Sequence, residues 1–145
     1  MAATAANTKD NPSIAPVELD KFRSMAEVWW YLVGKFRTLH KFNPGRLEHI
    51  RDGACAHFDR DTSSLTPLSG LTLLDVGCGG GLFLDGLEQK GFVSFGSDVS
   101  RQAAKVCGRR FGIPAVVGSL PNLPFQADSF GLVTMFHVLE HLHDP

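Results

Sequence analysis

Glycines alternate along the stretch GCGGG, at Gly77, Gly79 and Gly81, directly after the apolar run LTLLDV. A backbone without Cβ atoms can turn sharply there and let a ligand approach closely, as nucleotide-binding loops require. Dinucleotides, nucleoside triphosphates and S-adenosylmethionine all bind loops of this kind. The residues that accompany the glycines therefore have to distinguish among these ligands.

The surrounding residues favour one of the three ligands. The dinucleotide fingerprint G-x-G-x-x-G would need a glycine where Leu82 stands, and a P-loop would need a Gly-Lys-Ser/Thr ending that the sequence lacks. Asp98 ends the next apolar run, where a carboxylate can accept hydrogen bonds from the two ribose hydroxyls. The combination predicts an S-adenosylmethionine site, while a tight turn at the glycines and a helix cap at Asp98 are the plainer alternatives.

Titratable side chains are concentrated in FHVLEHLHD, a segment near the end of the sequence. They are His137, Glu140, His141 and His143. Methyl transfer from a sulfonium is an in-line displacement, so a base is needed only for a weakly acidic acceptor such as a phenol or catechol. His141 is the candidate catalytic base, and the alternative is that the segment LEH only starts a helix.

Composition excludes several classes of protein. The 145 residues are expected to form one domain, and 14 basic and 15 acidic residues nearly cancel, so no large field attracts nucleic acid or an anionic bilayer. No apolar run approaches the roughly 20 residues of a membrane-spanning helix, and residues 1–20 contain no secretory signal. The three cysteines match no zinc or redox spacing, so we expect free thiols and a cytoplasmic protein.

The elements that must position these residues follow from the periodicity of the chain. From Leu71 onward, short apolar runs alternate with helical segments, which is the pattern of βαβ units and a parallel sheet. Strands are expected at 71–77, 92–98, 115–118 and 130–138, and helices at about 82–90 and 101–111. The titratable segment then follows the fourth strand, at the end of the sheet where ligands bind in such folds.

Upstream of this region the pattern is helical. Apolar residues recur at helical spacing over 22–36, and a second helix is expected to start at Asn43, as its cap, and Pro44. Residues 59–70 are rich in Ser, Thr, Asp and Pro, as linkers are. The expected organisation is a disordered tail (1–20), an N-terminal helical segment (21–58), a linker (59–70) and a cofactor-binding domain (71–145).

The motifs LDVGCGGG, GSDVS and FHVLEHLHDP resemble those of class I S-adenosylmethionine-dependent methyltransferases, over Leu71 to Pro145. The upstream segment KFRSMAEVWWYLVGKFRTLHKFNPGRLEHI is similar, more narrowly, to the N-terminal helices of the ubiquinone-biosynthesis O-methyltransferases. The resemblance implies an α/β fold, the Rossmann-like three-layer sandwich of class I methyltransferases. It also implies truncation to the cofactor-binding half, with strands 1 to 4 and N-terminal helices, so that the domain over 71–145 is incomplete at its C-terminus.

The resemblance implies a set of cofactor contacts as well, at Arg46, Asp75, Gly77, Gly79, Gly81, Asp98 and Phe136. The glycine loop would lie against the methionine portion of S-adenosylmethionine, Asp98 would hold the ribose, and Phe136 would touch the cofactor. Arg46 belongs to an NP.RL motif, and its guanidinium could grip the methionine carboxylate with two parallel hydrogen bonds; the alternative is a solvated helix arginine. Many relatives bind the adenine amine with an aspartate where this chain has Ser119.

The same resemblance raises the question of a metal. In ubiquinone-biosynthesis methyltransferases the last segment reads E-x-x-E-H and is associated with a divalent metal such as magnesium. Glu140 and His141 are then the candidate metal ligands, and His137 stands where the first carboxylate would be. Because magnesium prefers oxygen ligands, this histidine is expected to weaken such a site or shift it towards a softer ion.

The function that the resemblance implies is O-methylation of a phenol- or catechol-type aromatic small molecule, such as a ubiquinone precursor. Two alternatives stay open: methylation of another small molecule, and a chain that binds the cofactor without turnover. Trp29, Trp30 and Tyr31 could form a membrane-interface helix suited to a polyprenyl substrate, or could pack in the core. An exposed edge at the fourth strand would favour self-association, and the chain by itself is expected to be inactive or nearly so.

Overall fold

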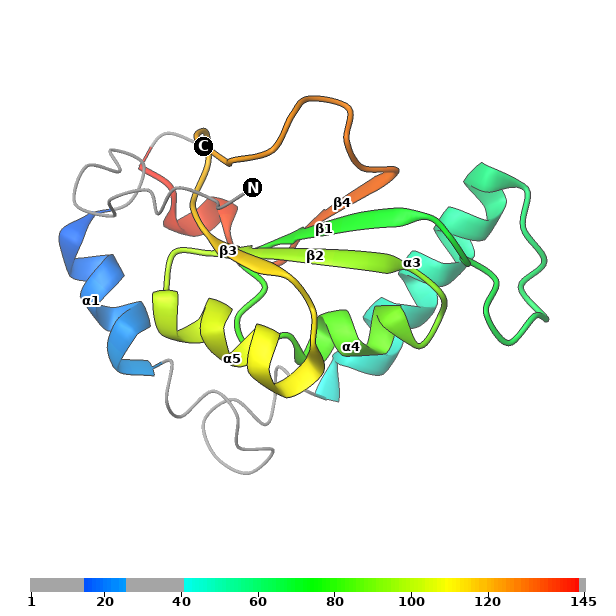
Figure 1. The fold of residues 1–145 in the computed structure, drawn as a ribbon, viewed down its shortest axis with the longest axis horizontal. Coiled ribbons are helices and arrows are strands. Elements are labelled where there is room, and N and C mark those ends of the chain that lie inside the picture. Colours follow the sequence, from blue (N-terminus) through cyan, green and yellow to red (C-terminus); the bar gives the residue numbers. More distant parts are fainter. Residues whose placement is uncertain (1–14, 26–40, 144–145) are drawn as a thin grey trace.

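The centre of the molecule is a parallel β-sheet. The computed structural model describes residues 15–25 and 41–143, and within them the sheet has four strands in the order β3-β2-β1-β4 (Figure 1). Their bounds are Thr72–Val76 for β1, Val93–Asp98 for β2, Ala115–Val117 for β3 and Leu132–Met135 for β4. Neighbouring strands all run parallel. Because β2 and β3 extend from one side of β1 and β4 lies on the other, β1 and β4 form the switch point where open α/β sheets bind ligands.

Helices connect the strands and cover one face of the sheet. The crossover helices α4 (Leu82–Glu88) and α5 (Arg101–Phe111) join β1 to β2 and β2 to β3, as parallel strands require (Figure 1). Helix α3 (Asn43–Phe58) packs against α4 at Gly86, where an added Cβ would lie 2.7 Å from the side chain of Leu47. This close approach fixes the start of α3 beside the sheet, which matters for the site described below.

The other face of β2 is covered by the loop between β3 and β4. A Cβ at Gly96 would meet Leu84 of α4, so Phe95, the preceding residue of the strand, faces away from that helix. There Phe95 packs on Phe130, with ring centroids 5.6 Å apart, and Phe130 packs on Phe125 at 5.1 Å. The described residues thus form helices, a parallel sheet and a loop as successive layers, an α/β arrangement that agrees with the fold implied by the resemblance.

Strand β4 forms the edge of the sheet beside β1. Val133 and Met135 of this strand are exposed, with 51% and 40% of their surface open. This agrees with the expected open edge at the fourth strand, and self-association through it stays a prediction. In the described ranges no helix combines the length and apolar character needed to cross a bilayer.

The hydrophobic core lies between the sheet and the helices. Its most deeply buried apolar residues are Cys55, Leu68, Leu73, Leu84, Leu87, Phe92 and Cys107. Leu68 comes from the segment expected to be a linker (59–70), and its N–H donates to the carbonyl of Lys90 at 3.1 Å. The end of that segment is therefore part of the folded core. The cysteines at positions 55, 78 and 107 are free and buried, as their spacing predicted for free thiols.

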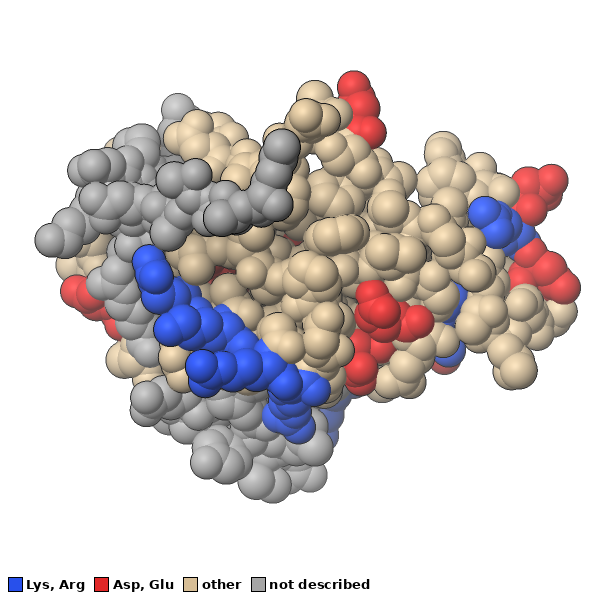
Figure 2. Space-filling view, in the orientation of Figure 1, with Lys and Arg blue, Asp and Glu red and all other residues tan. Residues whose placement is uncertain are grey.

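Charge is balanced over the chain but not over its surface. Helix α5 carries four basic side chains, at Arg101, Lys105, Arg109 and Arg110, and all of them are exposed. Figure 2 shows a continuous band of Lys and Arg over this helix. Arg109 and Arg110 lie in the last turn, where positive charge interacts favourably with the helix dipole. This arrangement gives the band a local structural role at the end of α5.

The expected elements are present, with differences at their ends. Helix α5 has the expected bounds, because Ser100 caps its start and Gly112, in the left-handed conformation, ends it. The expected cap Asn43 is instead the first residue of α3; Phe42 is the cap and no side chain bonds there. Helix α1 (Pro16–Met25) begins inside the expected tail (1–20).

One expectation lies outside the described residues. The tryptophan pair Trp29 and Trp30, with Tyr31, falls in the range 26–40, which the structure does not describe.

Candidate functional site

The glycine loop lies between β1 and α4, and its backbone requires glycine. Gly77, Gly79 and Gly81 have φ angles of 78°, 53° and 90°, in the left-handed region that residues with a Cβ rarely adopt. The N–H groups of Gly77 and of the next residue both donate to the carbonyl of Ser97, at 2.8 and 2.9 Å. A Cβ at Gly77 would lie 2.5 Å from Cγ2 of Val138. The loop is thus held against β2 on one side and against the segment after β4 on the other.

Asp98 ends β2 and ties the glycine loop in place. Its Oδ2 accepts a hydrogen bond from the N–H of Gly79 at 2.8 Å, and its Oδ1 accepts one from the N–H of Ser100 at 2.8 Å. Burial raises the pKa of the Asp98 carboxyl, and the two N–H donors oppose that rise. The cap of α5 is Ser100, whose Oγ accepts from the N–H of Ala103, so Asp98 is not the helix cap of the plainer interpretation. Each carboxylate oxygen has further lone pairs, which suits acceptance of ribose hydroxyls.

Asp75 lies in β1 and is buried among polar partners. Thr134 of β4 donates its hydroxyl hydrogen to Asp75 Oδ1 at 2.8 Å, across the paired strands. Burial raises the pKa of Asp75 to about 7, the nearby charge of Asp98 adds to the rise, and the Thr134 bond and the charge of Arg46 oppose it. Asp75 therefore lies beneath the loop, where it links β1 to β4.

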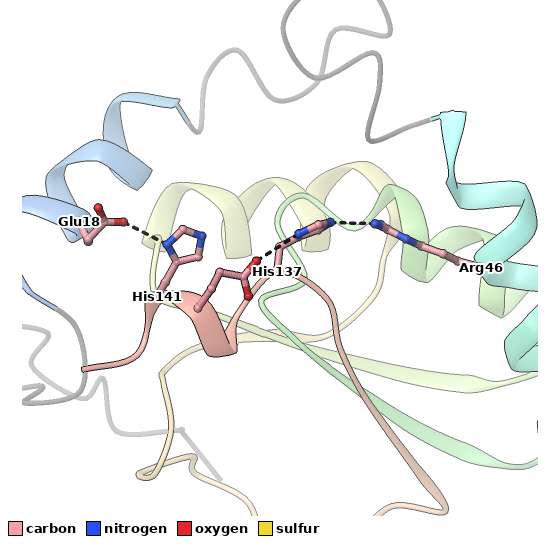
Figure 3. Close-up of polar contacts among 5 residues, drawn as sticks. Glu18, Arg46, His137 and His141 are labelled. Carbon is pink, nitrogen blue, oxygen red and sulfur yellow. Dashed lines mark hydrogen bonds and ion pairs between the residues drawn. The ribbon is translucent and has the colours of Figure 1, made fainter. Parts of the chain in front are cut away.

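Arg46 reaches this end of the sheet from the first turn of α3. Its guanidinium lies over the ring of Phe136, 4.8 Å from the centroid, and Phe136 in turn meets Phe83 edge to face at 5.2 Å. Nη2 of Arg46 is 2.8 Å from Nε2 of His137 (Figure 3). Arg46 is half-buried by these contacts, which bring it to the segment that follows β4, beside the end of β1 where the glycine loop begins.

His137 connects two of the expected residues. Its Nδ1 lies 3.2 Å from Oε1 of Glu140, while its Nε2 faces Arg46. A hydrogen bond to its own backbone N–H and the contact with His137 lower the pKa of Glu140. The sequence analysis named His137 among the titratable side chains of this segment and as a departure from the E-x-x-E-H pattern, without assigning it a role. Its contact with Arg46, 91 positions away, has no signal in local spacing.

His141, the candidate base, follows in the short 3-10 helix η2 (Leu139–His141). Its Nδ1 lies 3.2 Å from Oε2 of Glu18 in α1, so η2 and α1 meet here (Figure 3). Glu140 and His141 thus face different partners. In the part of the chain that is described, no group of three or more His, Cys, Asp or Glu side chains is arranged to hold a metal ion. The proposed pair of metal ligands gains no support from this geometry.

Ser119, where the resemblance led us to compare this chain with an adenine-binding aspartate, lies beyond β3. It is buried, and its Oγ donates to the carbonyl of Leu120 at 3.4 Å. The expected cofactor residues from α3, β1, β2 and β4 are therefore gathered at one end of the sheet, and the polar group after β3 lies at the same end.

Comparison with known proteins identifies the family to which the chain is related. Residues 74–145 match a family described as a methyltransferase domain. The chain is 42% identical to a ubiquinone biosynthesis O-methyltransferase of Sinorhizobium medicae over 99% of this chain and 58% of that protein. It is 36% identical to the protein of the same name from Bartonella bacilliformis, over 94% of this chain and 57% of that protein. The chain therefore spans a little over half the length of these relatives.

A solved structure shows the same fold. Magnesium protoporphyrin IX methyltransferase from Synechocystis PCC 6803, determined with bound SAM, superposes with a TM-score of 0.63 at 19% identity, over 97% of this chain and 66% of that one. At that identity the likeness concerns the fold alone. The sequence relatives, together with the glycine loop, the strand order and this shared fold, show that the chain belongs to the class I S-adenosylmethionine-dependent methyltransferases.

Proposed function

We propose that this chain binds S-adenosylmethionine and serves the transfer of its methyl group to a phenolic hydroxyl of an aromatic small molecule, such as a ubiquinone precursor. The observation that carries the proposal is the position of Arg46, over Phe136 and beside the glycine loop. The sequence relatives match both the N-terminal segment and the sheet, and their name, ubiquinone biosynthesis O-methyltransferase, supports the choice of an oxygen acceptor. A cytoplasmic location belongs to the same proposal.

The residues present fit the cofactor by charge. Glycine at position 77 lets the loop pack directly against Val138, which holds the loop at the end of β1. The guanidinium of Arg46 suits the methionine carboxylate, and the carboxylate of Asp98 suits the ribose hydroxyls. When bound, the sulfonium supplies the electrophilic methyl group; the chain supplies orientation, which accounts for much of the rate of such displacements.

His141 is the proposed proton acceptor. A carboxylate such as Glu18, 3.2 Å from Nδ1, favours a proton on that nitrogen and so leaves the basic lone pair on Nε2. A base placed in this way would accept the hydroxyl proton of a phenol as the methyl group is transferred. Glu18 would then orient the ring of His141, in the way carboxylates orient catalytic histidines.

Two measurements test the proposal. Isothermal titration of the chain with S-adenosylhomocysteine should show binding, with NADH as the control ligand that should not bind. Transfer of radiolabelled methyl from S-adenosylmethionine to a panel of catechols then tests the acceptor. Binding of NADH in place of S-adenosylhomocysteine would refute the cofactor assignment, and binding without transfer to any acceptor would favour a chain that only binds the cofactor.

A further inference from the structure

His137 lies between two charged side chains and makes a contact with each of them. Its ring nitrogens are 2.8 Å from Nη2 of Arg46 and 3.2 Å from Oε1 of Glu140 (Figure 3). These three residues come from the start of α3, the segment after β4 and the helix η2. Among the described residues, the imidazole is the group that fixes the direction of an N–H of the Arg46 guanidinium, since Phe136 contributes only a ring face.

The donors and acceptors determine the protonation of the ring. A guanidinium has five N–H donors and no acceptor, so Nε2 of His137 must accept from Arg46 and cannot carry a proton. The ring proton then lies on Nδ1, which donates it to Glu140. The imidazole is neutral in this arrangement and leaves the positive charge of Arg46 available to an anionic ligand.

The backbone places the ring where it can make both contacts. His137 follows β4 with a φ of 57°, in the left-handed region, and the next residue, Val138, lies against Gly77 of the loop. The chain thus turns sharply out of the strand at this point. This turn brings the imidazole towards Arg46 of α3 (Figure 3). The helix η2 begins at Leu139, two residues later, and the carboxylate of its second residue, Glu140, contacts the ring.

We propose that His137 is a positioning residue for cofactor binding: it holds the guanidinium of Arg46 with one edge directed at the carboxylate of the methionine moiety, and Glu140 holds His137. The proposal rests on the proposed function, because it concerns the same carboxylate. The bond to His137 occupies one N–H of Nη2 and leaves a two-pronged edge of the guanidinium for a carboxylate. A neutral imidazole does this without competing for the charge.

Binding of two ligands by a small set of variants tests the proposal. The ligands are S-adenosylhomocysteine, which has the carboxylate, and 5′-methylthioadenosine, which lacks it. His137→Leu removes the acceptor, whereas His137→Gln keeps an amide oxygen for Arg46 and an amide N–H for Glu140. His49→Leu, at an exposed histidine of α3, is the matched control.

Wild-type protein should bind both ligands. His137→Leu should weaken binding of S-adenosylhomocysteine by about three- to tenfold, the usual effect of losing one hydrogen bond, and leave binding of 5′-methylthioadenosine unchanged. His137→Gln and His49→Leu should behave as wild type. In an Arg46→Ala background, His137→Leu should have no further effect, because the two residues act through one contact.

Different results overturn different parts of the argument. If wild-type protein binds neither ligand, the proposed function fails, and the positioning role fails with it. If wild type binds S-adenosylhomocysteine and Arg46→Ala weakens it but His137→Leu does not, only the positioning role is overturned. Equal loss of both ligands in His137→Leu, or no rescue by glutamine, would also overturn it, because the histidine would then act on the fold and not on the guanidinium.

Discussion

Replacing Gly77 by alanine should destabilise the fold for two separable reasons. Its φ of 78° is left-handed, which costs a residue with a Cβ about 1–2 kcal/mol. The added Cβ would also lie 2.5 Å from Cγ2 of Val138, and such overpacking usually costs about 1–3 kcal/mol. Because valine is β-branched and turns little about χ1, the contact is not relieved by a simple rotation. The sum predicts a loss of about 2–5 kcal/mol in the free energy of unfolding.

The chain offers a matched control for the backbone part of this loss. Gly112 has a φ of 69°, and nothing lies within 4 Å of an added Cβ. Gly112→Ala should therefore cost only the backbone share, about 1–2 kcal/mol. Urea unfolding followed by far-ultraviolet circular dichroism measures both variants. In the Gly77→Ala background, Val138→Ala should restore the part of the unfolding free energy that is lost to the steric contact. The steric reasoning is refuted if Gly77→Ala costs no more than Gly112→Ala.

The remaining predictions concern a ligand contact, a buried acid and a helix cap. Arg46→Ala should weaken binding of S-adenosylhomocysteine by about 1.5–3 kcal/mol in calorimetry, with Arg46→Lys intermediate; unchanged affinity would remove Arg46 from the site. Because the pKa of Asp75 is raised to about 7, its protonated form favours the fold: stability should be greatest below pH 4 and fall as the pH rises through 7, relative to Asp75→Asn. A flat difference between these two proteins from pH 4 to 7 would contradict that pKa. Ser100→Ala should cost about 1 kcal/mol in urea unfolding, because the N–H of Ala103 loses its acceptor, and a neutral result would show that the cap contributes nothing.

Local signals predicted most of the fold because they act within a few residues. The bounds of α5 follow from a serine cap and a terminal glycine, which the sequence displays directly. Strand β4 was expected over 130–138 but spans Leu132–Met135. Its apolar residues continue beyond the strand, while the backbone turns out at His137 with a positive φ. An apolar run indicates burial and β propensity, but it does not indicate where a turn ends the strand pairing.

The candidate site was predicted in part. The glycines and Asp98 belong to motifs whose spacing is local, and they meet in the structure through the bond between Gly79 and Asp98. The contact of Arg46 with His137 depends on how α3 packs beside the sheet, which no periodicity encodes. The expected cap at Asn43 was wrong because the preceding residue, Phe42, already has helical φ and ψ angles. Asn43 therefore lies inside the helix, whereas a residue that caps a helix with its side chain has non-helical angles.

The buried cysteines make the chain a reporter of its own local opening. Cys78 lies in the glycine loop, Cys107 lies on α5 and Cys55 lies on α3. The neighbouring thiol of Cys107 and burial raise the pKa of the Cys78 thiol, which keeps it protonated and unreactive while the loop is closed. A thiol reagent can modify each cysteine only when its own layer opens, so pulse labelling read by mass spectrometry would resolve opening of the loop, the crossover helix and the N-terminal helix separately. Slower modification of Cys78 alone would then reveal a ligand seated on the loop, with no probe introduced into the protein.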